Sequence, residues 1–539
     1  MREMDTMTDH VSESKHPRAF EPSVFVLNII LAVLGAIIGM QIITTLGVTP
    51  NTSLIGVLVA IALSRIPGAV FSKYRSIHRQ NLVQSNISCS TFAAANSLLL
   101  PIGIPYLFGQ PDLIIPMLIG ATMGMLIDTA MLYWFFDSRV FPGSAAWPPG
   151  VAAAEAIYAG DQGGQRAKLL VWGSIIGVVG SFFKIPMSAL GTAFIGNIWA
   201  LAMFGIGLLL RGYSTSLFGI DINKLYIPHG MMIGAGVIAG FQILALLFKR
   251  RAHKVTTEND NNGSGYTRDD QDVRKGLTNG FVLYVLAAVV LAILGGVYTV
   301  MSVTQLIGWV IFAAVACILA EFIVGLSAMH AGWFPAFATT LIFLVLGILL
   351  GFPPVALALL VGFIASGGPA FADAGYDLKA GWMLRKDCGD HQYERDGRWQ
   401  QIMAAVTGSI VALVMVLFFY KVYFSQNLVP PVDRVFVATI KAGIDASVVQ
   451  NLLIWSIPGA IIQLLGGSKR QMGIMLATGL LILNPNAGYA VLAGLLIRVM
   501  VKRIKGSEYD TPMTILAAGF IAGDAIYSFV NSAFRAKWK

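Results

Sequence analysis

Long apolar runs alternate with short polar or Gly- and Pro-rich stretches along nearly the whole chain. A helix crosses a bilayer with about 20 apolar residues, so these runs predict an all-α polytopic membrane protein with roughly 14–16 transmembrane or re-entrant helices. The runs cover about residues 24–48, 52–71, 112–135, 166–184, 195–210, 229–248, 277–301, 305–325, 336–351, 355–372, 402–423, 448–466, 471–483, 487–501 and 512–530.

Five further stretches are apolar but rich in Gly, Pro, Asn and Ser, and we expect short or re-entrant helices there. Non-helical backbone at membrane depth survives only where protein or a water-filled cavity satisfies its polar groups. Such segments therefore indicate where a transport site lies. They cover residues 81–108, 142–160, 212–228, 326–335 and 369–384.

A polar segment divides the chain almost in half. It predicts four parts: a polar N-terminal tail (1–22), a first membrane half (23–248), a linker (249–276) and a second membrane half (277–539). The order and spacing of the first spans are similar in both halves, which suggests a duplication of the kind common in transporters. GxxxG spacings, such as Gly173/Gly177 and Gly519/Gly523, predict closely packed helix pairs.

Composition agrees with this pattern. Of the 539 residues 56% are hydrophobic and only 12% are charged, about half the ~25% of a soluble globular protein. The net charge of +9 arises from 37 basic and 28 acidic residues, which we interpret as positive charge in cytoplasmic loops and not as a nucleic-acid surface.

The distribution of basic residues predicts the orientation. Loop 65–79 has four basic residues and no acid, so we expect it and the N-terminus to be cytoplasmic, in the plasma or inner membrane. The basic segments at 502–505 and at the C-terminus lie on either side of one predicted span, which leaves the side of the C-terminus open.

Sequence motifs exclude several kinds of chemistry. The chain has no phosphate-binding GxxxxGK[ST] loop, no HExxH and no GxSxG, so we predict neither an ATP-driven pump nor a hydrolytic enzyme. Cys89 and Cys317 lie in apolar surroundings, far from each other and from Cys388. We therefore expect no disulfide, no metal site and no cofactor.

Acidic residues inside apolar runs are the strongest candidates for a coupling-ion site. A charge at that depth costs at least ~2.5 kcal/mol on insertion scales and usually has a partner or a task. Asp128, Glu155 and Asp524 lie deep in such runs and are our coupling-ion candidates. Glu321 and Asp373 lie near predicted span ends, where a structural role is equally consistent.

Polar residues between and within the spans predict a hydrophilic cavity. Segment 84–97 is the most polar intramembrane stretch; the alternative is that its side chains bond neighbouring helices, at about 0.6 kcal/mol each. The candidate substrate-binding or cavity residues are Gln84, Asn86, Thr91, Asn96, Trp147, Pro149, Glu155, Asp377, Lys379, Asn484 and Asn486.

Four motifs in order along the chain resemble those of the oligopeptide transporter family, which includes the yellow-stripe-like carriers of metal chelates. They are NLVQSNISCSTFAAANSLLLPIGIPYLFG at 81–109, WPPGVAAAE at 147–155, DLKAGW at 377–382 and GFIAGD at 519–524. The chain departs from the family in two ways that bear on substrate type. Arg79 stands where an acid is common, and long soluble loops are absent.

The resemblance implies about sixteen membrane segments and a secondary transporter, typically proton-coupled, for short oligopeptides or peptide-like metal chelates. We accordingly expect a small peptide or chelate, a coupling cation and membrane lipid as partners, with a homo-oligomer possible and no nucleic acid. Two other functions stay open: an intramembrane enzyme acting on a lipid-linked substrate, which would need a clustered catalytic set, and a channel, which would conduct without saturable uptake.

Overall fold

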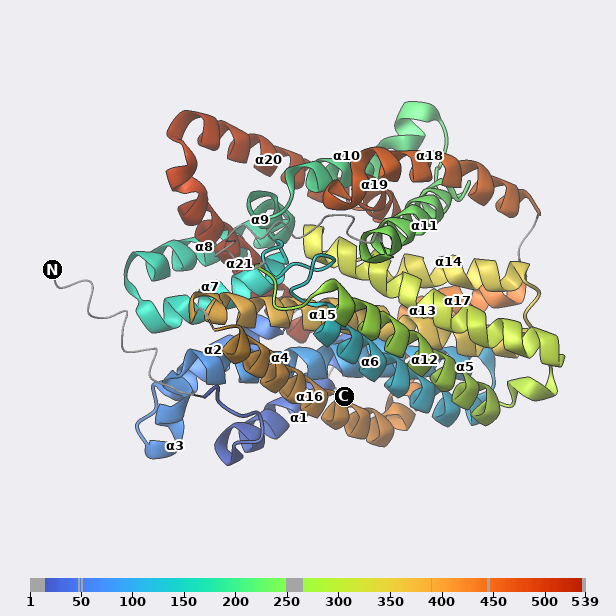
Figure 1. Ribbon diagram of the computed structural model, residues 1–539, viewed down its shortest axis with the longest axis horizontal. Coiled ribbons are helices and arrows are strands. Elements are labelled where there is room, and N and C mark those ends of the chain that lie inside the picture. Colours follow the sequence, from blue (N-terminus) through green and yellow to red (C-terminus); the bar gives the residue numbers. More distant parts are fainter. Residues whose placement is uncertain are drawn as a thin grey trace, which may run out of the picture.

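The computed structural model describes residues 15–46, 49, 52–248, 265–388, 390–443 and 446–535, and within these ranges it is helical, with one isolated β-bridge between Phe136 and Phe141 (Figure 1). The helices are α1 (Pro22–Leu46), α2 (Ser53–Ser64), α3 (Ala69–Ser72), α4 (Ile77–Phe92), α5 (Leu100–Phe108), α6 (Ile114–Phe135), α7 (Pro148–Gln162), α8 (Gly164–Phe182), α9 (Met187–Ile195), α10 (Ile198–Phe218), α11 (Ile227–Phe248), α12 (Asp270–Leu294), α13 (Val303–Ala331), α14 (Ala336–Leu349), α15 (Pro354–Arg385), α16 (His391–Ser425), α17 (Pro431–Ala442), α18 (Ala446–Arg470), α19 (Met472–Leu481), α20 (Pro485–Lys505) and α21 (Asp510–Arg535).

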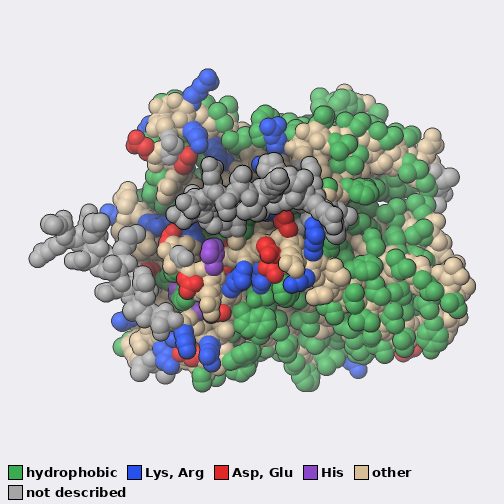
Figure 2. Space-filling model, in the orientation of Figure 1, with side chains coloured by type: hydrophobic (Ala, Val, Ile, Leu, Met, Phe, Trp, Pro, Cys, Tyr) green, Lys and Arg blue, Asp and Glu red, His purple; other side chains and the backbone are tan. Residues whose placement is uncertain are grey.

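Nine helical segments in the described ranges are long and apolar enough to cross a membrane, and α2, α14 and α19 are shorter apolar helices. Large apolar side chains on α8 and α12, among them Trp172 and Ile293, face outwards as they would towards lipid. Hydrophobic side chains cover much of the face shown in Figure 2, and charged side chains gather mainly in the left part of the view. The prediction of an all-α polytopic membrane protein is confirmed.

Helix α15 is the centre of the fold. It is buried along nearly its whole length and packs against α4, α6 and α7 of the first half and against α13 and α16 of the second. Further pairs join the halves, namely α8 with α21, α10 with α19 and α20, and α11 with α18. The two predicted halves are therefore interleaved, and the space between central helices is lined from both.

Two stretches predicted as short or re-entrant helices are continuous helix instead. Residues 369–384 belong to α15, which runs through Pro369, because buried neighbouring helices can satisfy the backbone groups that an intramembrane proline frees. Residues 81–108 form one helical segment in which a π-helical stretch, Ala93–Leu99, joins α4 to α5. The helix α12 also begins at Asp270, before the predicted end of the linker at 276; residues 249–264 of that linker lie outside the described residues.

The GxxxG prediction is confirmed where α8 crosses α21. A Cβ atom added to Gly173 would lie 2.9 Å from the Cα of Gly519, and one added to Gly177 would lie 3.0 Å from the Cα of Gly523. These distances leave no room for a side chain, so the four glycines let the two backbones meet directly. The contact places the end of the GFIAGD motif beside α8.

Charged groups concentrate at one end of the central helices. Arg398 and Arg385 are fully buried and pair with Glu394, and Arg398 also lies 3.7 Å from Asp137. Nearby, Glu21 before α1 pairs with Lys73 and Arg79 of the basic loop, so the N-terminal segment and loop 65–79 lie together.

His16 anchors the N-terminal segment at this end. Its ring packs 4.9 Å from the ring of His78 and 5.5 Å from that of Tyr393. Burial, with the positive charge of Arg385 as the next cause, lowers the pKa of His16 from 6.5 to about 2. The imidazole is therefore neutral where it is docked.

Candidate transport site

A cavity of about 800 Å³ opens among α1, α4, α15, α17, α21 and the α13–α14 connection. Its size falls within the range of small-molecule binding sites, and both halves contribute to its wall. The residues lining it are Ile43, Thr49, Phe92, Asn96, Leu100, Pro149, Ser188, Thr192, Gly332, Trp333, Phe334, Ala336, Phe337, Thr340, Ala365, Pro369, Tyr376, Val432, Phe436, Ile482, Ile521, Asp524, Ala525, Ser528 and Asn531.

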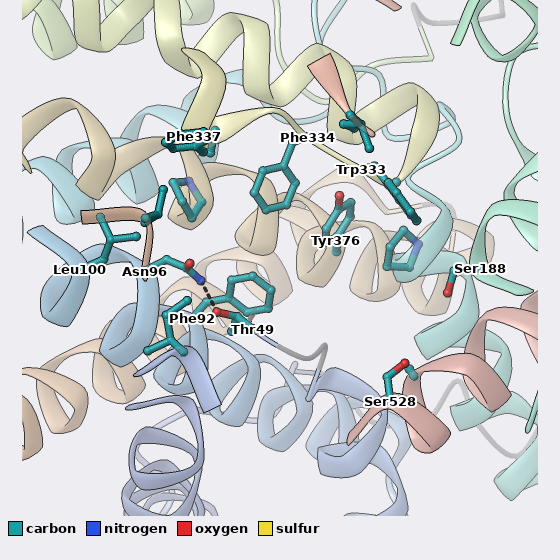
Figure 3. Close-up of a pocket in the computed structure, with 18 of the residues that line it drawn as sticks. Thr49, Phe92, Asn96, Leu100, Ser188, Trp333, Phe334, Phe337, Tyr376 and Ser528 are labelled. Carbon is teal, nitrogen blue, oxygen red and sulfur yellow. Dashed lines mark hydrogen bonds between the residues drawn. The ribbon is translucent and has the colours of Figure 1, made fainter. Parts of the chain in front are cut away.

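Aromatic side chains form most of the middle of this cavity. Figure 3 shows Phe334 and Tyr376 between a group with Phe92, Asn96 and Leu100 on one side and a group with Ser188, Trp333 and Ser528 on the other. The Tyr376 hydroxyl is buried and has no hydrogen-bond partner among the described residues. It is thus an unsatisfied donor on a residue of the cavity wall.

Polar groups lie towards both sides of the aromatic middle. On one side the Asn96 amide donates to Thr49 Oγ1 at 2.8 Å (Figure 3). On the other, Asp524 accepts bonds from Ser181 Oγ at 2.5 Å and from the backbone N–H of Ser188 at 3.0 Å. Asp524 is the one charged residue among the described lining residues, so the cavity has a negative side and a side with neutral donors.

Asp524 owes its position to the packing of α21. The glycines of GFIAGD bring this helix against α8, which carries Ser181, and the first turn of α9 supplies the backbone N–H. An N-terminal helix turn presents free N–H groups and a partial positive charge to an anion. These bonds fix the Asp524 carboxyl group at the cavity wall.

Asp373 and Asp377 lie next to the cavity, between α15 and α4. Both are buried, although the sequence placed Asp373 near a span end. Ser88 Oγ donates to Asp373 at 2.7 Å, and the Gln84 amide donates to Asp377. The predicted cavity residues Gln84 and Asp377 thus bond each other and do not line the cavity.

A second buried acid pair joins α6, α12 and α13. The hydroxyl of Tyr284 lies within hydrogen-bond distance of one oxygen of Asp128 and one of Glu321, and the remaining oxygen of each acid has no partner among the described residues. A tyrosine hydroxyl has one hydrogen to donate. Both bonds can form only when one of the two acids carries a proton, which donates to the tyrosine oxygen.

Glu155 is held by a cation instead. Its two carboxylate oxygens accept bonds from Arg166 Nε at 2.8 Å and Nη2 at 2.9 Å, an arrangement with both charge and planar geometry matched. Lys379 is on α15, where its ammonium group donates to the Gly143 carbonyl at 2.8 Å and lies over the Trp382 ring. Neither residue lines the cavity.

The other predicted cavity residues divide clearly. Asn96 and Pro149 line the cavity. Four others serve the packing: the Asn86 amide donates to the Ala404 carbonyl, Thr91 bonds within α4 and to Thr52, Trp147 is fully buried at the start of α7, and Asn484 caps α20. Asn486 is exposed and does not line the cavity.

Sequence reasoning missed the aromatic wall and one buried acid. Trp333, Phe334 and Phe337 surround a break between α13 and α14, and that break was the available signal. Asp433 on α17 is fully buried, and neither of its oxygens has a partner among the described residues. No apolar run marks α17, because its short sequence mixes charged and apolar residues.

Comparison with known proteins gives one result and one negative finding. A protein-family model described as OPT oligopeptide transporter protein matches residues 22–248 and 223–535, which together cover nearly the whole chain. The search of curated proteins found no match.

Proposed function

The chain belongs to the oligopeptide transporter family, and we propose that it is a secondary transporter that carries short oligopeptides, or peptide-like metal chelates, together with protons. Membership makes the chain an integral membrane transporter and not an enzyme. The proposal adds the coupling ion, the substrate range and the residues that serve them.

The observation that carries the proposal is the cavity with a carboxylate on one side and neutral donors on the other. A peptide has an ammonium group at one end and a carboxylate at the other. We place the ammonium group at Asp524 and the carbonyl or carboxylate oxygens at the Tyr376 hydroxyl and the Asn96 amide. The aromatic residues between them suit side chains of many shapes, since flat apolar walls bind by area and not by specific bonds.

For the coupling proton we propose the Asp128–Tyr284–Glu321 cluster. It lies between α6, α12 and α13, three helices that are long and apolar enough to cross a membrane. It has no basic partner among the described residues, and its hydrogen bonds require one proton to be held. A Cβ atom at Gly367 would clash with the Asp128 carboxylate, so the acid rests directly on α15. Pro369 and Tyr376 of the same helix line the cavity. Helix α15 therefore connects the proton-binding cluster to the substrate cavity.

The remaining coupling candidates take other tasks in this proposal. Glu155 is neutralised by Arg166 and fastens α7 to α8. Asp524 receives the substrate. We further propose that the charged end formed by Glu21, Lys73 and Arg79 faces the cytoplasm, because short basic loops are retained on that side.

The test is uptake of a labelled tripeptide or tetrapeptide into proteoliposomes, with and without an inward proton gradient. We expect the gradient to drive accumulation in the wild type. Asp128→Asn should abolish gradient-driven accumulation but leave exchange of internal for external peptide, whereas Asp524→Asn should raise KM. Asp112→Asn is a matched control, since Asp112 is exposed close to the start of the same helical segment.

Two outcomes would contradict the proposal. Peptide and chelate uptake that is indifferent to the proton gradient in the wild type would exclude proton coupling. Gradient-driven accumulation that survives in Asp128→Asn at the wild-type level would remove the Asp128 cluster from the mechanism while leaving the transport function intact.

A further inference from the structure

We propose that Cys89, Asp373 and Asp377 form a binding site for a divalent transition-metal ion between α4 and α15. The Cys89 sulfur and one carboxylate oxygen from each acid lie within 4.8 Å of one another, and all three residues are buried. The sequence predicted apolar surroundings for Cys89 and no metal site. The structure places the thiol against two carboxylates, because Asp373 and Asp377 are four residues apart on one face of α15.

The hydrogen bonds around the two acids leave their inner oxygens available. Ser88 donates to Asp373 Oδ1, and Gln84 donates to Asp377 Oδ1. In contrast, Asp373 Oδ2 is buried with no partner among the described residues, and Asp377 Oδ2 accepts a bond from the Cys89 thiol at 3.4 Å. Polar partners that hold one side of a carboxylate and leave the other free are characteristic of metal sites, where such outer bonds orient the ligands.

Charge also favours a divalent cation. Neither Asp373 nor Asp377 forms an ion pair within the part of the chain that the structure describes, and the nearby Lys379 donates to a backbone carbonyl instead. An ionised carboxylate buried without a partner is costly. A divalent ion would balance both carboxylates at once, and the thiol would release its proton to solvent on binding.

The donor atoms indicate which ions would bind. Magnesium and calcium prefer sites made of oxygen alone, whereas a thiolate selects softer ions such as Zn²⁺ or Co²⁺. Three protein ligands would leave a fourth position of a tetrahedral ion for water or another donor. Cys89 is one helical turn from Phe92 and Asp377 is next to Tyr376, and both of these neighbours line the cavity. The proposed metal site therefore lies directly beside the cavity wall.

A metal-binding experiment tests this independently of transport. The purified full-length protein, stripped of metal with a chelator, is titrated with Co²⁺, and the thiolate-to-cobalt charge-transfer absorption is recorded. We expect the absorption band in the wild type and in a Cys317→Ser/Cys388→Ser variant, whose remaining cysteine is Cys89. Cys89→Ser should lose the band, and Asp373→Asn should weaken cobalt binding by at least about tenfold.

A substitution of Cys89, Asp373 or Asp377 can impair folding. The Cys317→Ser/Cys388→Ser variant keeps the test decisive in that case, because it leaves these three residues unchanged. Zn²⁺ should displace Co²⁺ and abolish the band, whereas Mg²⁺ in excess should not. No band in the wild type, or a band that disappears in the double variant, would overturn the proposal. With no band in the wild type, the two acids Asp373 and Asp377 would share a proton and bind no metal. Loss of the band in the double variant would assign the metal to Cys317 or Cys388.

Discussion

The ion pair between Glu155 and Arg166 gives an asymmetric prediction. Glu155 is 3% exposed and Arg166 is 31% exposed. Removing Arg166 therefore costs a different amount of folding free energy from removing Glu155. Arg166→Gln leaves a buried carboxylate without its cation. Glu155→Gln leaves an arginine that can turn towards water and a neutral amide in the buried position.

The structure sets the expected magnitudes. Removing one partner of a fully buried pair costs about 3–5 kcal/mol, and the exposure of Arg166 reduces this to about 2 kcal/mol for Arg166→Gln. For Glu155→Gln we expect about 1 kcal/mol or less, since no charge is left buried. The double variant should resemble Glu155→Gln, because the second substitution removes a partner that is no longer used. The coupling between the sites then equals the loss in Arg166→Gln, about 2 kcal/mol.

The assay is the melting temperature of the purified protein in detergent, followed for the wild type, both single variants and the double variant. The expected order of stability is wild type, then Glu155→Gln and the double variant together, then Arg166→Gln. Equal losses in both single variants, or an additive loss in the double variant, would refute the reasoning. Normal gradient-driven transport by Glu155→Gln would further agree with a structural role for this acid.

Three other perturbations have defined outcomes. Gly519→Leu should lower the melting temperature strongly, because a Cβ atom at Gly519 lies 2.7 Å from the Cα of Gly173 and overpacking costs about 1–3 kcal/mol. Gly308→Leu is the control and should leave the melting temperature nearly unchanged, since Gly308 has open space around it. Phe334→Ala should raise KM for peptides with large apolar side chains about tenfold, with kcat nearly unchanged, since an aromatic contact contributes roughly 1.5 kcal/mol or more. Docking of His16 should weaken as pH falls below 6.5 towards 2, because in this range the undocked imidazole binds a proton and the docked imidazole does not. Limited proteolysis at Arg18 should then be faster at pH 5 than at pH 8. This pH difference should vanish in His16→Gln.

Hydrophobic patterning predicted the helices well because bilayer thickness dictates the length of an apolar run. The predicted spans at 112–135, 229–248 and 512–530 correspond closely to α6, α11 and α21. The run at 195–210 lies in α10 apart from its first three residues. The short helices α9 and α17 were missed, since neither forms a long apolar stretch.

The same patterning predicted breaks less well. Pro369 and neighbouring glycines indicated a broken helix, but α15 continues through them because it is surrounded by protein. Whether a proline breaks a membrane helix depends on its neighbours, and a single sequence does not give them.

The sequence predicted that a polar cavity exists but identified only some of the residues that line it. Asn96 and Pro149 were predicted as cavity residues and lie in the cavity wall, next to helix breaks, whereas Asp524 was predicted as a coupling-ion candidate and also lies in that wall. Gln84 and Asp377 were expected to face a ligand and instead bond each other. Pairings between residues nearly 300 positions apart depend on which helices become neighbours, and the periodicity of one segment contains no such information.

The central claim is that peptide and proton move together through this chain. The most direct measurement records both in the same proteoliposomes, with a pH-sensitive dye inside and a labelled peptide outside. We expect that adding peptide without any imposed gradient acidifies the interior in the wild type, and that Asp128→Asn takes up peptide to equilibrium without acidification. Peptide uptake by the wild type with no accompanying proton entry would contradict it.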